Sequence, residues 1–227
     1  MKQMKNILVV APHADDEVIG CGGIIAKYAK RGYNVYVAIM TNAHLGAPEL
    51  FSADMITKVR KESKMAHKIL GVKETFFYDF PAPKLDTTPS YQISNELSKL
   101  YNSLEIEVLY LPHRGDIHKD HTVIFYAGLV SARPINNCPV KTIFTYETLS
   151  ETEWAAPFGS DVFIPNVFEE INDSVSIKLE AMKCFKSQLK EFPHSRSLES
   201  IENLAKHRGA TVGKNYAESF GLIRSIK

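Results

Sequence analysis

The chain has 227 residues, of which 44% are hydrophobic and 23% charged, a composition typical of a globular protein with a buried core. Its 27 basic and 26 acidic side chains leave a formal charge of +1, which gives no electrostatic reason to expect nucleic acid or an anionic membrane as a partner. A chain of this length fits one domain, so we expect residues 1–227 to form a single domain with an elaborated C-terminal part.

The N-terminus and the cysteines favour a cytoplasmic protein. A short basic start is followed by an apolar run, Ile7 to Ala11, that is too short for the core of a signal peptide. No apolar stretch of transmembrane length follows it, so we expect no membrane-spanning segment. The cysteines at 21, 138 and 184 are widely spaced and odd in number, which fits reduced thiols better than a disulfide framework or a Cys-x-x-Cys metal site.

Strand-like runs alternate with helix-period stretches along the first two thirds of the chain. In chain order the expected elements are a strand at 6–11, a helix at 24–30, a strand at 34–41, a helix at 56–70, a strand at 74–79, a helix at 92–101, a strand at 106–112, a helix at 122–131 and a strand at 141–147. Several of the strands are apolar throughout, which is typical of strands covered on both faces. The alternation predicts an α/β, Rossmann-like fold with a mostly parallel, doubly wound sheet.

The pattern changes after Glu147. Residues 149–173 are rich in turn-forming residues and contain the single tryptophan, so we expect loops or a short antiparallel excursion there. Residues 173–192 then predict one amphipathic helix. Its apolar side would consist of Val175, Leu179, Met182, Phe185 and Leu189.

A His-x-Asp-Asp-Glu motif, in PHADDE, follows the first predicted strand directly. In open α/β sheets, ligands bind at the carboxyl ends of the strands. Adjacent carboxylates repel one another and burial makes each harder to ionise, but a bound dication removes both problems. His13 and Asp16 lie three residues apart and can turn toward one ion. The acids could instead favour a helix N-terminus, a structural role that suits Glu17 best.

Three glycines after this motif, Gly20, Gly22 and Gly23, raise the alternative of a dinucleotide site. The fit is poor, because in that fingerprint the glycines follow the strand directly, whereas an acidic cluster that would repel a pyrophosphate intervenes here. These glycines more readily allow the following helix to pack closely on the sheet.

A second motif, HRGDIHKDH, follows the predicted strand at 106–112. His118 and His121 lie three residues apart at the predicted start of a helix, and His113 either borders the pocket or is a turn residue. Two histidines and one carboxylate are common ligands of a catalytic zinc and also suit iron(II), so the spacing does not identify the metal. Together the two motifs predict a metal centre. The other histidines are expected to be core or surface residues: His44, His67, His194 and His207.

The motifs PHADDE and HRGDIHKDH resemble the signatures of the LmbE-like, or PIG-L, family of zinc-dependent de-N-acetylases. VRKESKMAHKILGV is similar to the family's helix after the second strand, and RGATVGKNYAESFGLIR is similar to its closing segment. The resemblance implies a zinc-dependent hydrolase that removes the acetyl group from an N-acetylglucosamine-type sugar or its conjugate. It also implies a small-molecule substrate and a homo-oligomer, either a trimer or a hexamer.

Carried over by position, the resemblance assigns roles to six residues of the two motifs. The metal ligands would be His13, Asp16 and His121. Asp15 would be the general base, and His118 the electrostatic partner and acid. Asp120 would orient a histidine.

Recognition of the sugar is where the chain departs from the family pattern. Arg60, by position alone a solvated helix charge, would reach the sugar hydroxyls according to the resemblance. Many members carry Pro-Asp-Gly after the third strand, where this chain has DFPAPKLD. Ala82 stands where that aspartate would fall, so either Asp86 replaces it or the sugar is recognised differently.

Two other classes of function remain open. A nucleotide-sugar or dinucleotide-dependent enzyme on a Rossmann-type sheet would retain nicotinamide rather than metal on purification. A metal-binding module without turnover would tend to lose its base first, whereas Asp15 and His118 are both present. Release of acetate, measured with and without a chelator, separates these functions from the hydrolase.

Overall fold

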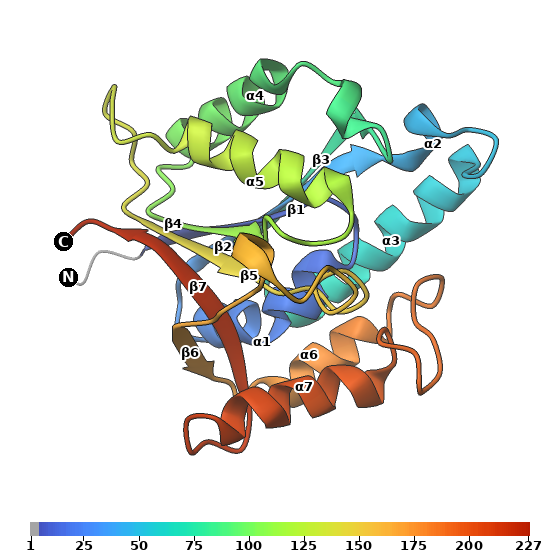
Figure 1. The fold of residues 1–227 in the computed structure, drawn as a ribbon, viewed down its shortest axis with the longest axis vertical. Coiled ribbons are helices and arrows are strands. Elements are labelled where there is room, and N and C mark those ends of the chain that lie inside the picture. Colours follow the sequence, from blue (N-terminus) through green and yellow to red (C-terminus); the bar gives the residue numbers. More distant parts are fainter. Residues whose placement is uncertain (1–4) are drawn as a thin grey trace.

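The computed structural model describes residues 5–227, so most of the basic start lies outside the described residues (Figure 1). At its centre is a seven-stranded sheet with the order β3-β2-β1-β4-β5-β7-β6. The strands are β1 (Asn6–Ala11), β2 (Asn34–Asn42), β3 (Glu74–Pro81), β4 (Val108–Pro112), β5 (Thr142–Tyr146), β6 (Val167–Glu170) and β7 (Ala217–Ser225). The first five pair in parallel, and β7 pairs antiparallel with β5 and β6. The predicted α/β fold with a mostly parallel sheet is confirmed.

Helices cover both faces of this sheet, with α4 and α5 on one face and α1, α3, α6 and α7 on the other (Figure 1). The helices are α1 (Asp16–Lys30), α2 (Ala43–Gly46), α3 (Ala53–Leu70), α4 (Ser90–Ser103), α5 (Lys119–Ser131), α6 (Val175–Met182) and α7 (Leu198–Ala210). Two short 3₁₀ helices, η1 (Leu85–Thr87) and η2 (Gly159–Asp161), lie in loops. Among residues 5–227 no helix combines the length and apolar character needed to cross a bilayer.

The apolar run of β1 is buried from both sides. Val9 and Ala11 belong to the core cluster under α1, whereas Leu8 and Val10 belong to the cluster under α4 and α5. Burial of each large aliphatic side chain stabilises the fold by about 1.5–3 kcal/mol. This two-sided burial is why the strand is apolar at successive positions and not only at alternate ones.

The C-terminal part differs from the sequence prediction. The antiparallel excursion is confirmed by β6, but the helix predicted over 173–192 is wrong beyond Met182, where α6 ends. The backbone N–H and the hydroxyl of Ser187 are hydrogen-bonded to the Glu62 carboxylate on α3, so Ser187 makes tertiary bonds instead of continuing a helix. The following segment, residues 183–197, runs as turns back toward the carboxyl ends of the strands. Helix α7 and strand β7 were not predicted.

The glycines of α1 pack closely against neighbouring elements, as the sequence suggested. A Cβ atom on Gly20 would lie 2.3 Å from the ring of Tyr146, and one on Gly23 would lie 2.7 Å from Ile171. Both contacts are far shorter than van der Waals distance, so only glycine allows α1 to approach this closely.

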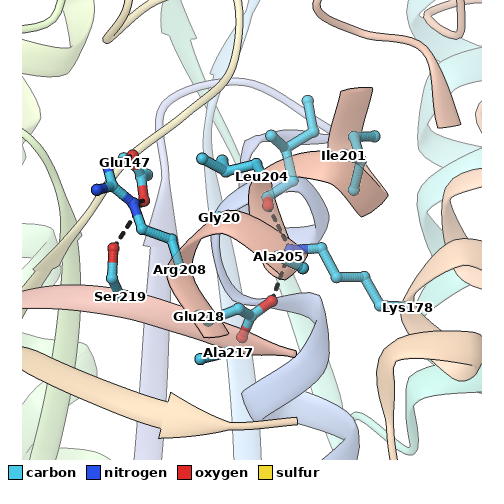
Figure 2. Close-up of a pocket in the computed structure, with 11 residues that line it drawn as sticks. Gly20, Glu147, Lys178, Ile201, Leu204, Ala205, Arg208, Ala217, Glu218 and Ser219 are labelled. Carbon is cyan, nitrogen blue, oxygen red and sulfur yellow. Dashed lines mark hydrogen bonds and ion pairs between the residues drawn. The ribbon is translucent and has the colours of Figure 1, made fainter. Parts of the chain in front are cut away.

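A buried ion pair ties the C-terminal part to the middle of α1 (Figure 2). Lys178 Nζ lies 2.6 Å from Glu218 Oε1 and donates a further hydrogen bond to the carbonyl of Ile19 at 2.7 Å. The Glu218 carboxylate also accepts the N–H groups of Gly23 and Ile24, at 2.8 and 2.7 Å. Each charged group is therefore satisfied away from water, as a buried pair requires.

Substituting Lys178 with methionine is expected to lower the free energy of unfolding by about 3–5 kcal/mol, because Glu218 would be left as a buried charge without its partner. Urea denaturation would measure the loss. Replacing Lys178 and Glu218 together with Met and Gln should recover part of it. A loss below about 1 kcal/mol in the single variant would show that other groups stabilise the buried charge of Glu218.

Candidate metal and active site

The two sequence motifs meet at one edge of the sheet. PHADDE connects β1 to α1, and HRGDIHKDH connects β4 to α5. Strands β1 and β4 are parallel neighbours, so their carboxyl ends open at the same edge. The chain order along the sheet reverses there, with β2 and β3 on one side of β1 and β4 on the other. Such a switch point is where open α/β sheets bind ligands.

His13, Asp16 and His121 converge at this edge. Asp16 Oδ2 lies 3.4 Å from His13 Nδ1 and 3.3 Å from His121 Nε2, and one ligand atom from each residue lies within 4.8 Å of the others. Asp16 Oδ1 and His121 Nε2 are buried without a hydrogen-bond partner among the described residues. Buried polar atoms are seldom left unpaired. Two imidazoles and one carboxylate that converge in this way, with unpaired buried atoms on Asp16 and His121, are a donor set that fits a divalent cation.

Carboxylates behind the two imidazoles fix the ring orientations. Asp120 Oδ2 lies 3.1 Å from His13 Nε2, and Asp116 Oδ2 lies 2.7 Å from His121 Nδ1. Asp116 is held in turn by the hydroxyl of Thr152, which donates to Oδ1 at 2.6 Å. Each ring therefore keeps its other nitrogen directed toward Asp16, the arrangement that orients histidine ligands in metal sites. The contact of Asp116 was not predicted, although the residue lies within the second motif.

The electrostatics of the three converging side chains favour bound positive charge. Burial alone would lower the pKa of both histidines, but their hydrogen-bonded carboxylates raise the pKa of His13 to about 9 and that of His121 to about 10. Burial alone would raise the pKa of Asp16, and the two histidines hold it well below its usual range. In the protein without metal, protons on the imidazoles supply the charge that the carboxylates attract, and a dication can take their place.

Asp15 lies beside these residues and lines the adjoining cavity. Its Oδ2 atom accepts no hydrogen bond from the described residues and lies 3.4 Å from Nη1 of Arg196. Burial raises the pKa of Asp15 to about 8, and the guanidinium of Arg196 opposes that rise. The Asp15 backbone has φ 114°, a region that residues other than glycine rarely adopt and that is often found at functional sites.

His118 caps the N-terminus of α5 and also lines the cavity. Its Nδ1 accepts the backbone N–H of Asp120 at 3.2 Å, and its ring centroid lies 4.5 Å from that of His13. Burial and the charge of His13 lower the pKa of His118 to about 4. His113 is not part of the cavity lining, and its Nε2 lies 2.7 Å from the carbonyl oxygen of Asp161.

Of the three residues considered for sugar recognition, Arg60 and Ala82 line the cavity and Asp86 does not. Arg60 on α3 lines the cavity, where its Nη2 donates to the carbonyl of Tyr78 at 2.8 Å and to Asp79 Oδ1 at 2.6 Å. Ala82 is buried in the cavity wall. Asp86 is exposed on η1 and is not part of the lining, so the structure does not bring it to the position of the missing aspartate.

The cavity above the converging side chains has a volume of about 510 Å³, which is within the range of small-molecule sites. One wall is apolar and comes from Ile39, Phe51, Met55, Ile56 and Val59. Asp15, His118 and His13 form part of the polar side.

Glu151 and Arg196 belong to this cavity but were not predicted from the sequence. Arg196 donates from Nε to Ser150 Oγ at 2.6 Å, and its Nη2 lies 3.4 Å from Glu151 Oε1. Neither residue belongs to a motif, and Arg196 comes from the segment 183–197. Their place in the site depends on long-range packing for which the local sequence carries no signal.

Comparison with known proteins identifies the family. A family model described as PIG-L, GlcNAc-PI de-N-acetylase, matches residues 8–132. The uncharacterized deacetylase YaiS of Escherichia coli K12 is 31% identical over 192 residues, which cover 81% of this chain and 91% of YaiS. The chain belongs to the PIG-L family. A diacetylchitobiose deacetylase of Thermococcus kodakarensis is also similar to this PIG-L protein, with 24% identity over 98% of this chain and 85% of the relative.

Solved structures share the fold of this PIG-L protein at lower identity. The 4-carboxy-2-hydroxymuconate hydratase GalB of Pseudomonas putida KT2440 has a TM-score of 0.81 and 20% identity, covering 99% of this chain and 98% of GalB. Teicoplanin deacetylase Orf2, solved in a zinc-inhibited form, has a TM-score of 0.78 and 16% identity, covering 97% and 99%. Because a hydratase and a deacetylase share the fold, the reaction must be argued from the site.

Proposed function

We propose that this PIG-L family member is a metal-dependent hydrolase that removes the acetyl group from an N-acetylglucosamine-type amino sugar or its conjugate. The observation that carries the proposal is the convergence of His13, Asp16 and His121, with unpaired buried atoms, beside the Asp15 carboxylate at the wall of a sugar-sized cavity. Membership of a deacetylase family supports the reaction class.

We assign the metal to these three residues, and zinc is the metal that we propose. Two imidazoles and one carboxylate are common ligands of a catalytic zinc, and iron(II) can use the same donors. When bound, such a cation supplies a Lewis acid that acidifies water and polarises a carbonyl oxygen. Asp120 acts on two histidines, since its carboxylate orients His13 and its backbone N–H is bonded to His118.

Asp15 is the general base in this proposal. Its Oδ2, which accepts no hydrogen bond from the described residues, takes the proton of the attacking water as the new C–O bond forms. When the C–N bond then breaks, the same carboxyl group returns this proton to the departing nitrogen, which gives acetate and the free amine. In the metal-free protein burial raises the pKa of Asp15 to about 8, so this carboxyl group can hold a proton near neutral pH.

His118 stabilises the oxyanion. Because its Nδ1 accepts the N–H of Asp120, the neutral ring carries its proton on Nε2 and can donate it in a hydrogen bond. The acid role that the resemblance implied requires a protonated ring, and in the metal-free protein burial and the charge of His13 lower the pKa of His118 to about 4. We therefore assign delivery of the proton to Asp15 and not to His118.

The sugar would lie in the cavity with Arg60 near its hydroxyl groups, and the apolar wall would contact the carbon face of the ring or of the attached group. We also propose that the chain forms a trimer or a hexamer, the states that the family resemblance implies. Light scattering during size-exclusion chromatography would measure the mass.

The proposal is tested by incubating the zinc-loaded protein with N-acetylglucosamine and with N,N′-diacetylchitobiose, and by measuring both acetate and primary amine. We expect the two products to form in equal amounts, to disappear after treatment with a chelator and to return when zinc is restored. Release of acetate that persists without metal would contradict the proposed mechanism. Failure of the zinc-loaded protein on a full panel of acetylated amino-sugar conjugates would contradict the proposed reaction.

Replacing Arg196 with methionine should shift the pH dependence of kcat/KM. The guanidinium lowers the pKa of Asp15, so its removal raises that pKa further. A base works only when deprotonated, so the acidic limb of the profile should move to higher pH, with a smaller change on the alkaline side. A profile that drops equally at every pH would indicate that Arg196 acts on something other than Asp15.

A further inference from the structure

A chain of hydrogen bonds connects Asp15 to residues outside the cavity lining. Glu17 Oε2 accepts the backbone N–H of Asp15 at 3.1 Å, and Glu17 Oε1 lies 2.8 Å from His67 Nε2. His67 Nδ1 lies 2.8 Å from Thr75 Oγ1 on β3. The side chains of Glu17 and His67 are 0% and 3% exposed, and neither residue belongs to the cavity lining.

The group that this chain holds is the backbone of the proposed base. Asp15 precedes the first turn of α1 with φ 114° and ψ −26°, a conformation that a residue with a Cβ atom adopts only when its surroundings impose it. Its carbonyl already accepts the N–H groups of Val18 and Ile19. The hydrogen bond from the Asp15 N–H to Glu17 fixes the preceding peptide unit, so both peptide units that flank the Asp15 Cα atom are held.

The residues behind Glu17 limit its freedom to move. Glu17 Oε1 is hydrogen-bonded to His67 Nε2, and the other ring nitrogen of His67 is hydrogen-bonded to Thr75, so the Glu17 side chain is held from behind. His67 lies on α3 and Thr75 on β3, so the chain of hydrogen bonds ties the turn after β1 to two neighbouring elements. Partners of this kind, behind the reacting groups, commonly determine how well a site is ordered.

We propose that Glu17 and His67 are positioning residues that hold Asp15 in its strained conformation and thereby direct its carboxylate toward the substrate. The inference rests on the proposed function for its kinetic consequence, but its structural content does not depend on turnover. Glu17 and His67, two buried residues outside the cavity lining, would then act on the reaction only through the Asp15 backbone.

The structural part is tested in the metal-free protein by amide hydrogen exchange. The Asp15 N–H should be protected in the wild type and should exchange at least about tenfold faster in Glu17→Leu and in His67→Leu, with a smaller increase in His67→Leu. Unchanged exchange at Asp15 in both variants would overturn the inference, whether or not the protein hydrolyses any substrate.

The kinetic part is tested with zinc-loaded variants at a temperature well below their melting points. Glu17→Leu should lower kcat by about tenfold or more, with KM within about twofold and zinc content unchanged. Glu17→Gln keeps an oxygen that can accept the Asp15 N–H, so it should retain most of the turnover. If Glu17→Leu does not fold, His67→Leu takes its place. A kcat in Glu17→Gln as low as in the leucine variant would contradict a role based on this hydrogen bond.

A double-mutant cycle separates positioning from general stability. Adding Glu17→Leu to Asp15→Ala should cause little further loss of kcat, because the side chain that Glu17 positions is already absent. Glu218→Gln is the matched control, because it alters another buried carboxylate bonded to N–H groups of α1; it should lower the melting temperature and leave kcat unchanged. If the losses of kcat in the two single variants multiply in the double variant, the inference is overturned. Absence of acetate release by the wild type would instead disprove the proposed function.

Discussion

Replacing Asp15 with alanine is expected to lower kcat by about 10²- to 10⁴-fold, the range typical of a lost general base, while the protein keeps its metal. The reason is that the carboxylate lines the cavity beside His13 and Asp16 but is not one of the three converging ligands. The measurement is acetate release under saturating substrate, together with the zinc content of the same sample.

The control for this variant is Asp86→Ala, because Asp86 is an exposed aspartate outside the cavity lining. Its kcat and KM should both match the wild type. Near-normal turnover of Asp15→Ala would show that another group accepts the proton of the water. A higher KM in Asp86→Ala would revive the possibility that Asp86 replaces the family's missing aspartate.

Replacing His121 with alanine is expected to remove both the metal and the turnover. Its Nε2 is one of the converging ligand atoms, and the ring is fully buried between Asp16 and Asp116. Loss of the ring removes one of the three donor atoms, so we expect metal affinity to fall by more than the 10- to 100-fold typical of changes behind a ligand. Zinc content after dialysis and the rate of acetate release are the two measurements.

His207→Ala is the matched control, because His207 is an exposed histidine on α7. It should retain zinc and full turnover. Circular dichroism of His121→Ala would show whether the fold survives. A folded His121→Ala protein that still binds zinc with the wild-type affinity would exclude His121 as a ligand.

The strands and the metal motifs could be predicted because their signals are local. The apolar run of β1 reflects burial on both faces, and His13 with Asp16 follows it within one turn. The alternation of strands and helices then brings the second motif to the same edge, because parallel strands all end on one side. The meeting of the two motifs at one edge of the sheet therefore follows from this topology.

The C-terminal part could not be predicted, because its pattern is ambiguous. Phe185 and Leu189 do contribute to the core, as the helical periodicity of 173–192 suggested, but they do so from turns beyond the end of α6. The burial of these two residues was therefore predicted correctly, although the helix predicted around them was wrong. The hydrogen bonds from Ser187 to Glu62, far away in sequence, decide the backbone there.

The contacts of His67 with Glu17 and of Arg196 with Asp15 could not be predicted from the sequence either. His67 was predicted as a core or surface residue, and it is buried, but its pairing with Glu17 spans two elements that only the folded sheet brings together. Arg196 reaches Asp15 from the segment 183–197. Neither contact has a sequence signature, because each depends on tertiary packing.

A zinc-edge anomalous difference map from crystals grown with zinc tests the proposed metal site most directly. We predict a peak at about 2.0–2.2 Å from one nitrogen of each of His13 and His121 and from a carboxylate oxygen of Asp16. A peak held by other residues, or no peak in zinc-saturated crystals, would contradict the proposed site and the hydrolysis that depends on it.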